Sequence, residues 1–386
     1  MTPVRLAEEV LPTLAEHAAA VDAAAQFPEA GVSALRKSGL MGLLVPQQYG
    51  GLGGDLTDLV AVARTLASGC LSTAMIWAMH CQQVDALVRH SSDPLRGELL
   101  PRIAAGQVYL ASVTTEPAKG GHLLSAVAAL RAADDLLELR RDAPIVTGGQ
   151  HADGFLVTMR ASEDAAAQRV SLVYVDREQV SFETTGTWEP LGMRGTHSVG
   201  MRLTAAIPRH QVVGEAGQFR AVAVDSMIPV GHLGWASCWL GGAHAALRAV
   251  VRLVGSRERP RSTDPSSELV LERLARVRMD LELVGAYLDR VVAEITAHRG
   301  AGTSTDTPAT QIHLNVVKVA AAELTFRAVS RLMQLVGVST GYLRTSPIPL
   351  ERLFRDLRSA SLNYSDDRLL TAIGSLSLID RGVRLA

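Results

Sequence analysis

Hydroxyl and glycine residues at the end of an expected strand are the groups in this sequence best suited to binding a planar or phosphorylated ligand. Thr114 and Thr115 end a strand expected over residues 109–115, and Pro117 and the glycine pair 120–121 follow. Proline and glycine turn the chain sharply there and expose backbone N–H groups. Such a turn can contact the edge of a ring or hold a pyrophosphate, although most sequences of this kind are only strand ends.

Two more motifs follow in order along the chain. The first begins with Ile145, Val146 and Thr147 and precedes a strand expected over residues 155–159. The second covers residues 190–198 and reads Pro-Leu-Gly-Met-Arg-Gly-Thr-His-Ser. In this order and spacing, the three motifs resemble the middle β-domain of the acyl-CoA dehydrogenase family, flavoenzymes that desaturate acyl thioesters. The resemblance extends over nearly the whole chain.

The resemblance implies an α+β fold with an N-terminal helical domain, a central β-barrel or sandwich and a C-terminal four-helix bundle. The apolar pattern agrees with this order. Residues 4–107 have helical periodicity, with long helices expected at about 56–67 and 72–89. Residues 108–214 alternate as strands do, most clearly at 170–175. Residues 215–386 contain amphipathic stretches at 243–254, 269–295, 311–336 and 366–378, which predict the bundle. We therefore expect domains at 1–107, 108–214 and 215–386.

Composition excludes several classes of protein. The 386 residues carry a net charge of −1, so the sequence offers no electrostatic case for binding nucleic acid or an anionic membrane surface. Cys70, Cys81 and Cys238 have no metal-ligand spacing, and we expect reduced thiols in a cytoplasmic protein. Residues 1–10 are too charged for a signal peptide, and the uncharged stretch 227–247 is expected to be a buried core helix.

The resemblance assigns a flavin site to the three motifs. Thr114 and Thr115 match the strand end that contacts the edge of the isoalloxazine ring, and Gly121 falls where the family has a serine beside the pyrophosphate. Val146 and Thr147 match the segment next to the ring, with the Thr147 hydroxyl near flavin N5. The family places a large side chain, often tryptophan, at the position held here by Ile145.

A second set of residues matches elements that bind the adenine-diphosphate end of FAD in a neighbouring subunit. These residues are Arg257, Gln334, Gly337 and Val338, although the phenylalanine usual after the arginine is replaced around Pro260. The resemblance therefore implies FAD as the cofactor and a homodimer or homotetramer as the assembly. A plain solvated arginine at a helix end is the alternative for Arg257.

The catalytic base is where this sequence departs from the family. Most members carry a glutamate in a turn after an Arg-Asp pair, and that pair is Arg355 and Asp356 here. Counting forward places Tyr364 at the glutamate position. A minority of the family carries the glutamate on the first long helix of the bundle, where this chain has Gly231 followed by His232. Neither position holds a carboxylate.

Three replacements for the base are conceivable. His232 titrates near neutrality and lies one residue from the alternative position, although an isolated histidine on an apolar helix is more often a core residue. Tyr364 is a poor base because its unperturbed pKa is near 10, but its hydroxyl can orient a substrate. Asp366 and Asp367 reach the site only if the turn shifts, and otherwise cap the following helix.

The sequence thus predicts an FAD-dependent oxidoreductase that dehydrogenates an acyl thioester on coenzyme A or a carrier protein, with His232 and Tyr364 as candidate catalytic residues. An electron-transfer flavoprotein or a flavin reductase is the implied redox partner. Two alternatives remain open. One is a flavin-dependent monooxygenase of the same fold, which needs no glutamate base, and the other is a non-redox scaffold that has lost the activity.

Overall fold

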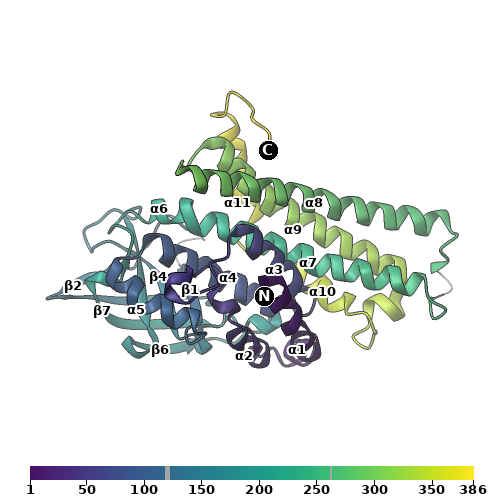
Figure 1. The fold of residues 1–386 in the computed structure, drawn as a ribbon, viewed down its shortest axis with the longest axis horizontal. Helices are drawn as coiled ribbons and strands as arrows, with labels where there is room; N and C mark the ends of the chain where they lie inside the picture. The colour runs from purple at the N-terminus through teal and green to yellow at the C-terminus, as the bar shows by residue number, and fades with distance from the viewer. Residues whose placement is uncertain (118–121, 261–262) are drawn as a thin grey trace.

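The structure is a computed structural model that describes residues 1–117, 122–260 and 263–386. Helices form both ends of the chain and strands its middle (Figure 1). The α+β fold class is therefore confirmed. Helices give way to strands between Ala104 and Leu110, and strands to helices between Val213 and Phe219. The division into three domains at residues 107 and 214 stays a prediction.

The N-terminal part is a cluster of helices packed against the bundle. It contains α1 (Pro3–Ala24), α2 (Glu29–Lys37), α3 (Leu56–Ala67), α4 (Leu71–His90) and α5 (Asp93–Ala104), with single 3-10 turns η1 (Leu40–Gly42) and η2 (Gln47–Tyr49). The start of α3 is fixed by a capping box, in which the Asp55 carboxylate accepts from the Thr57 and Asp58 N–H groups. The predicted bounds of α3 are confirmed, and those of α4 differ by one residue at each end.

Two four-stranded sheets form the central part. The first has the order β1 (Leu110–Val113), β4 (Gly154–Arg160), β5 (Val170–Asp176) and β8 (Val212–Val213), and β1 pairs with β4 in parallel. The second is antiparallel, in the order β2 (Arg131–Ala133), β3 (Leu136–Ala143), β7 (Gly200–Pro208) and β6 (Val180–Thr185). The strand predicted over 109–115 is shorter than expected, because Thr114 and Thr115 lie beyond the last β1 pair, Val113 with Val157.

The register of β3 and β7 brings two sequence motifs together. Ala143, the last residue of β3, lies opposite Met201 at the start of β7. The segment after β3 therefore runs beside the segment before β7, and the Val146 N–H donates to the Val199 carbonyl at 3.0 Å. The motif that begins with Ile145 and the motif of residues 190–198 thus meet at one edge of the β-domain.

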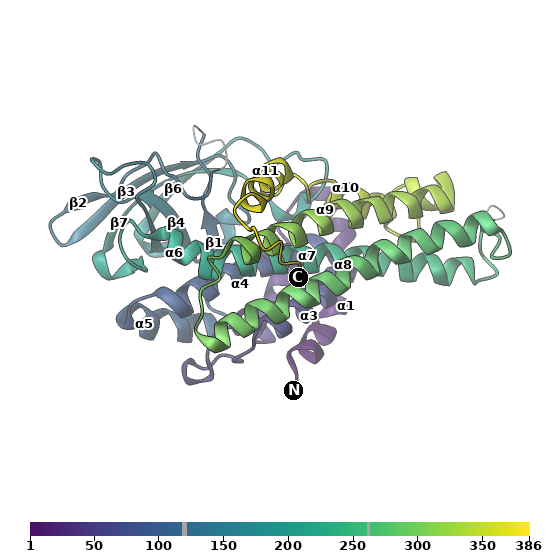
Figure 2. The same cartoon turned by 90° about the horizontal axis from the view of Figure 1, so that it is seen from above.

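Long helices form the C-terminal part. They are α7 (Ile228–Val254), α8 (Glu268–Ala301) and α9 (Pro308–Gly337), which lie side by side in both views (Figures 1 and 2). Shorter helices complete it: α6 (Phe219–Val222), the π-helix η7 (Ala223–Met227), the π-turn η9 (Val338–Tyr342), α10 (Leu350–Arg358) and α11 (Asp366–Ser377). The four predicted bundle helices exist, but α7 begins fifteen residues earlier than the apolar stripe predicts.

The uncharged stretch 227–247 is a buried core helix, as expected. It covers the last residue of η7 and about the first three quarters of α7, which packs against α3, α4, α8 and α9. A Cβ at Gly241 would lie 2.4 Å from the Arg64 carbonyl oxygen of α3, so this close helix crossing requires glycine. Within the described part of the chain, no helix is long and apolar enough to cross a membrane. All three cysteines are buried and unpaired.

Candidate active site

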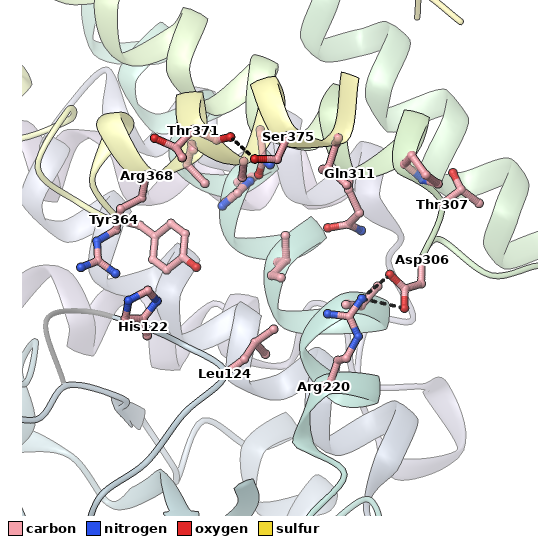
Figure 3. Close-up of a pocket in the computed structure, with 18 of the residues that line it drawn as sticks. His122, Leu124, Arg220, Asp306, Thr307, Gln311, Tyr364, Arg368, Thr371 and Ser375 are labelled. Carbon is pink, nitrogen blue, oxygen red and sulfur yellow. Dashed lines mark hydrogen bonds and ion pairs between the residues drawn. The ribbon is translucent and has the colours of Figure 1, made fainter. Parts of the chain in front are cut away.

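A cavity of about 930 Å³ lies where the bundle meets the β-domain (Figure 3). Helices α7, α9 and α11 form most of its wall, with α6, η7 and the segment after residue 121. The polar side chains that line it include His232, Gln311, Asn315, Tyr364, Thr371 and Ser375. The rings of His232 and Tyr364 lie with centroids 6.0 Å apart. The cavity therefore brings together the two residues predicted to be catalytic.

His232 presents one ring nitrogen to the cavity in a defined state. Its Nδ1 lies 3.0 Å from the Leu314 carbonyl oxygen of α9, and the carbonyl can only accept, so Nδ1 carries the proton. Nε2 is then the unprotonated atom. Burial lowers the pKa of His232 to about 4, and the Leu314 hydrogen bond opposes this only in part. The imidazole is therefore neutral at physiological pH, with its basic lone pair on Nε2.

Tyr364 is fixed through its backbone. Its φ of 56° is left-handed, which is unfavourable for a side chain of this size. Lys318 holds the turn, because its ammonium donates to the carbonyl oxygens of Ala360 and Tyr364, each at 2.9 Å, and to Asp366 Oδ1 at 2.6 Å. Burial raises the pKa of Tyr364, so its hydroxyl stays protonated at neutral pH. Figure 3 shows that hydroxyl directed into the cavity.

Lys318 was missed by the sequence analysis. It lies on the apolar face of α9, its side chain is fully buried, and its ammonium also lies 5.5 Å from the centre of the Trp239 ring. The signal was present, since a lysine inside the stripe 311–336 needs a buried partner. Identifying Asp366 as that partner requires the packing of α9 against α11, because the two residues are 48 positions apart.

The structure also shows why a carboxylate does not fit simply at position 231. A Cβ on Gly231 would lie 2.4 Å from Gln82 Nε2, and that amide donates to the Met227 carbonyl at 2.6 Å. A side chain at position 231 would therefore break this contact between α4 and η7. The prediction that Asp366 caps α11 is wrong, because Ser365 is the N-cap residue and Asp366 is paired with Lys318. Asp367 is exposed and also lines the cavity.

Other motif residues hold the framework together. Glu116 is buried and accepts from the Val127 and Ala128 N–H groups while it pairs with Arg141 on β3. The Asp356 carboxylate accepts from the Met193 N–H at 2.6 Å, and burial raises the pKa of Asp356 to about 6. The Glu116 contacts fix the end of β1, and the Asp356 contact ties α10 to the Gly-Met-Arg-Gly-Thr motif.

A chain of hydroxyl groups begins at Thr147. Its Oγ1 lies 3.1 Å from Ser198 Oγ, which lies 2.8 Å from Thr196 Oγ1, and Thr196 donates to the Met193 carbonyl at 2.8 Å. Each hydroxyl has one proton. Because the last proton goes to a carbonyl, Ser198 donates to Thr196 and Thr147 donates to Ser198. Thr147 therefore presents acceptor lone pairs to the open space beside it.

Comparison with known proteins identifies the family. The model of the acyl-CoA dehydrogenase N-terminal domain matches residues 5–107, and that of the acyl-CoA dehydrogenase C-terminal domain matches residues 233–363, together more than half of the chain. The chain belongs to the acyl-CoA dehydrogenase family. Members are flavin-dependent, and the chain is an acyl-CoA dehydrogenase-like flavoprotein oxidoreductase.

Individual relatives are distant in sequence. A probable acyl-CoA dehydrogenase of Mycobacterium leprae is 24% identical over 367 residues, covering 95% of this chain and 91% of the relative. Butyryl-CoA dehydrogenase from Megasphaera elsdenii has 19% identity, a TM-score of 0.86 and 97% coverage of both chains. FMN-bound TdsC of a Paenibacillus species, a dibenzothiophene monooxygenase, has 20% identity, a TM-score of 0.88 and 98% coverage of both. These structural likenesses establish the fold.

The residues present at the β-domain edge of this acyl-CoA dehydrogenase family member fit a flavin ring. Ile145 is 49% exposed, which leaves an apolar face uncovered between Thr115 and Thr147. Thr115 donates to the Ile145 carbonyl at 3.0 Å, and Thr147 offers an acceptor beside it. Thr114 and the buried Val146 flank them. Gly121, predicted to lie beside the pyrophosphate, is outside the described residues.

The second predicted set of flavin-binding residues lies at the opposite end of the molecule. Arg257 follows the C-terminus of α7. Gln334 and Gly337 lie at the end of α9 and Val338 begins η9, far along the bundle from the β-domain (Figure 1). Arg257 and Gln334 are exposed, and Val338 is 68% exposed. Within one chain these residues cannot meet Thr115 and Thr147.

Proposed function

We propose that the protein is an FAD-dependent oxidoreductase that removes hydrogen from the α and β carbons of an acyl thioester, with His232 as the base. The observation that carries this proposal is the neutral His232 ring, whose Nε2 lone pair lies on the side of the ring away from its hydrogen bond to Leu314 and on the wall of the cavity. A histidine with a pKa of about 4 is as basic as an ordinary glutamate, whose pKa is about 4.3.

Each residue then has a defined task. His232 Nε2 takes the α-proton, and the Nδ1–H bond to Leu314 keeps the ring in that tautomer. The Tyr364 hydroxyl orients the substrate by a hydrogen bond, since it stays protonated. A bound flavin supplies the acceptor for the two electrons that leave with the β-hydrogen. His232 is only 2% exposed, which limits the access of water to its ring.

The distant position of Arg257 and the α9 terminus supports a cofactor site shared between two copies of the chain. We propose that these residues bind the adenine-diphosphate end of a flavin held by the β-domain of a second copy, in a homodimer or homotetramer. The bound flavin is then FAD. We expect acid-released cofactor to run with FAD and not with FMN in chromatography. FMN, or no flavin after reconstitution, would contradict the shared site.

Thr147 is expected to tune the flavin more than the fold. Its lone pairs can accept a hydrogen bond from N5–H of the reduced ring, a bond worth about 0.5–1.5 kcal/mol. Thr147→Val should therefore lower the two-electron reduction potential of the bound flavin by about 10–30 mV, with nearly unchanged thermal stability. Thr204→Val, on the exposed face of β7, is the control. An unchanged potential in Thr147→Val would place this residue away from N5.

The absence of a carboxylate at positions 231 and 364 favours one alternative, a flavin-dependent monooxygenase of the same fold. Anaerobic mixing with acyl thioesters separates the two. Bleaching of the flavin without oxygen indicates dehydrogenation, with an electron-transfer flavoprotein as the expected acceptor. A flavin reduced only by an external reductase, which then consumes oxygen with substrate, indicates oxygenation. Protein that binds no flavin at all would indicate a non-redox scaffold.

A further inference from the structure

A buried amide without a protein partner lies on the wall of the active-site cavity. Asn315 of α9 lines the cavity and is only 7% exposed, and its side chain makes no hydrogen bond with any described residue. Its amide atoms are not sealed inside the protein but reach the cavity, where water or a ligand can pair with them. The Asn315 amide is therefore available to a ligand that enters the cavity.

The position of Asn315 places it beside the proposed base. The preceding residue, Leu314, supplies the carbonyl that fixes the His232 ring. Gln311 lies one turn nearer the exposed Arg220–Asp306 pair at the rim, and its amide already donates to the Thr305 carbonyl at 3.0 Å. Asn315 lies about 12 Å along α9 from Thr307 at that rim. Asn315 therefore lies deeper from that rim than Gln311, next to the residue that fixes the His232 ring.

The rest of the cavity wall has a largely buried apolar part and an exposed polar part. Val224, Ile228 and Leu369 supply hydrocarbon surface. Thr371 and Ser375 of α11 donate their hydroxyl protons to carbonyls of their own helix, at 2.8 and 3.0 Å, which leaves them acceptor lone pairs (Figure 3). A purely saturated chain would cover the Asn315 amide without pairing it, whereas the exposed hydroxyls of Thr371 and Ser375 stay open to water.

We propose that Asn315 selects an acyl group that carries a hydrogen-bonding substituent over a saturated chain of the same length. The inference rests on the proposed function, since it takes the cavity to bind an acyl thioester. A site that hydrogen-bonds a substrate group discriminates strongly against the analogue that lacks the group, because its own buried polar atoms are then left unpaired. The substrate class is a short acyl thioester with a polar group, such as a hydroxyl or an amine, on the acyl chain.

Four thioesters of equal chain length test this proposal: butyryl-CoA and its 2-, 3- and 4-hydroxy derivatives. Binding to the flavin-loaded enzyme is measured by titration calorimetry under anaerobic conditions, so that the readout is affinity and not turnover. We expect at least one hydroxybutyryl-CoA to bind about tenfold more tightly than butyryl-CoA. In Asn315→Leu, which keeps nearly the same shape, that preference should disappear while butyryl-CoA binds at least as well.

Gln311→Leu is the matched control, and it should change all four affinities by a similar factor. Asn315→Ala is a second variant in case the leucine variant does not fold, and it should also lose the preference. The proposal is overturned if wild type binds the four thioesters equally, or if Asn315→Leu weakens all four alike, which would place the amide on the common thioester. Failure of every thioester to bind wild type would instead overturn the proposed function, and this inference with it.

Discussion

Replacing His232 with glutamine is expected to slow anaerobic flavin reduction by a saturating acyl thioester by about 10²–10⁴-fold, the usual cost of losing a general base. Glutamine has a similar size, but its amide cannot take the α-proton. Stopped-flow absorbance of the bound flavin measures the rate, and the flavin should remain bound. His244→Gln is the matched control, since His244 lies on the same helix α7 but is exposed and outside the cavity.

The same prediction has a pH signature. Because burial lowers the pKa of His232 to about 4, the base is deprotonated above about pH 5, and the rate should be flat from there to neutrality. An acid limb near pH 6.5 would contradict a buried base. The free energy of unfolding should also depend on pH. The unfolded chain, in which a histidine has a pKa of about 6.5, binds the proton more readily than the folded protein does, so the fold loses stability as the pH falls from about 6.5 towards 4. Buried His80, with a pKa also lowered to about 4, adds to this loss.

Two variants of Tyr364 complete the test. Tyr364→Phe should have a small effect, because it removes one hydrogen bond worth about 0.5–1.5 kcal/mol. Tyr364→Glu restores the family's carboxylate in a turn already held by Lys318, and we expect it to raise the rate of proton abstraction in the His232→Gln background. If His232→Gln behaves as wild type and Tyr364→Glu gains nothing with any thioester, dehydrogenation is the wrong reaction. Oxygenation or a non-redox role then replaces it.

Local patterns predicted the elements of this fold well, and their boundaries less well. Helix α3 could be located to the residue because Asp55 and Asp58 form a capping box at its start. Helix α7 was predicted in two overlapping parts, a buried helix over 227–247 and a stripe over 243–254, because its first half is apolar on all sides and shows no amphipathic stripe. Helix α10, with nine residues, was not predicted, since its burial depends on α9 and on the contact from Asp356 to Met193.

The residues of the candidate site fall into two groups: those that local motifs predicted and those that only the folded structure shows. His232 and Tyr364 were found from motif positions, and the structure places their rings in one cavity. Asn315 and Lys318 were not found, although both interrupt the apolar stripe of residues 311–336. A polar residue in such a stripe signals a buried partner or a ligand. Which of the two it signals depends on tertiary packing, since Lys318 pairs with Asp366, whereas Asn315 lines the cavity and has no hydrogen-bond partner among the described residues.

Removing the buried ammonium of Lys318 is expected to cost about 3–5 kcal/mol of unfolding free energy. Lys318→Met keeps the length of the side chain but leaves the Asp366 carboxylate buried and unpaired, and leaves the Ala360 and Tyr364 carbonyls without their donor. Urea unfolding at fixed protein and flavin concentrations measures the loss. Lys37→Met is the control, because the side chain of Lys37 is exposed, and it should change stability by less than about 0.5 kcal/mol.

The double variant Lys318→Met/Asp366→Leu separates the buried charge from the hydrogen bonds of the turn. Replacing both ions removes the unpaired carboxylate, so part of the stability lost in Lys318→Met should return. The Tyr364 turn should not recover, because its carbonyl still lacks a donor in a left-handed conformation. Tyr364→Glu should therefore raise the rate of anaerobic flavin reduction when Lys318 is present, and should not raise it in the double variant. Equal gains in both backgrounds would show that Lys318 stabilises the bundle without positioning residue 364 for chemistry.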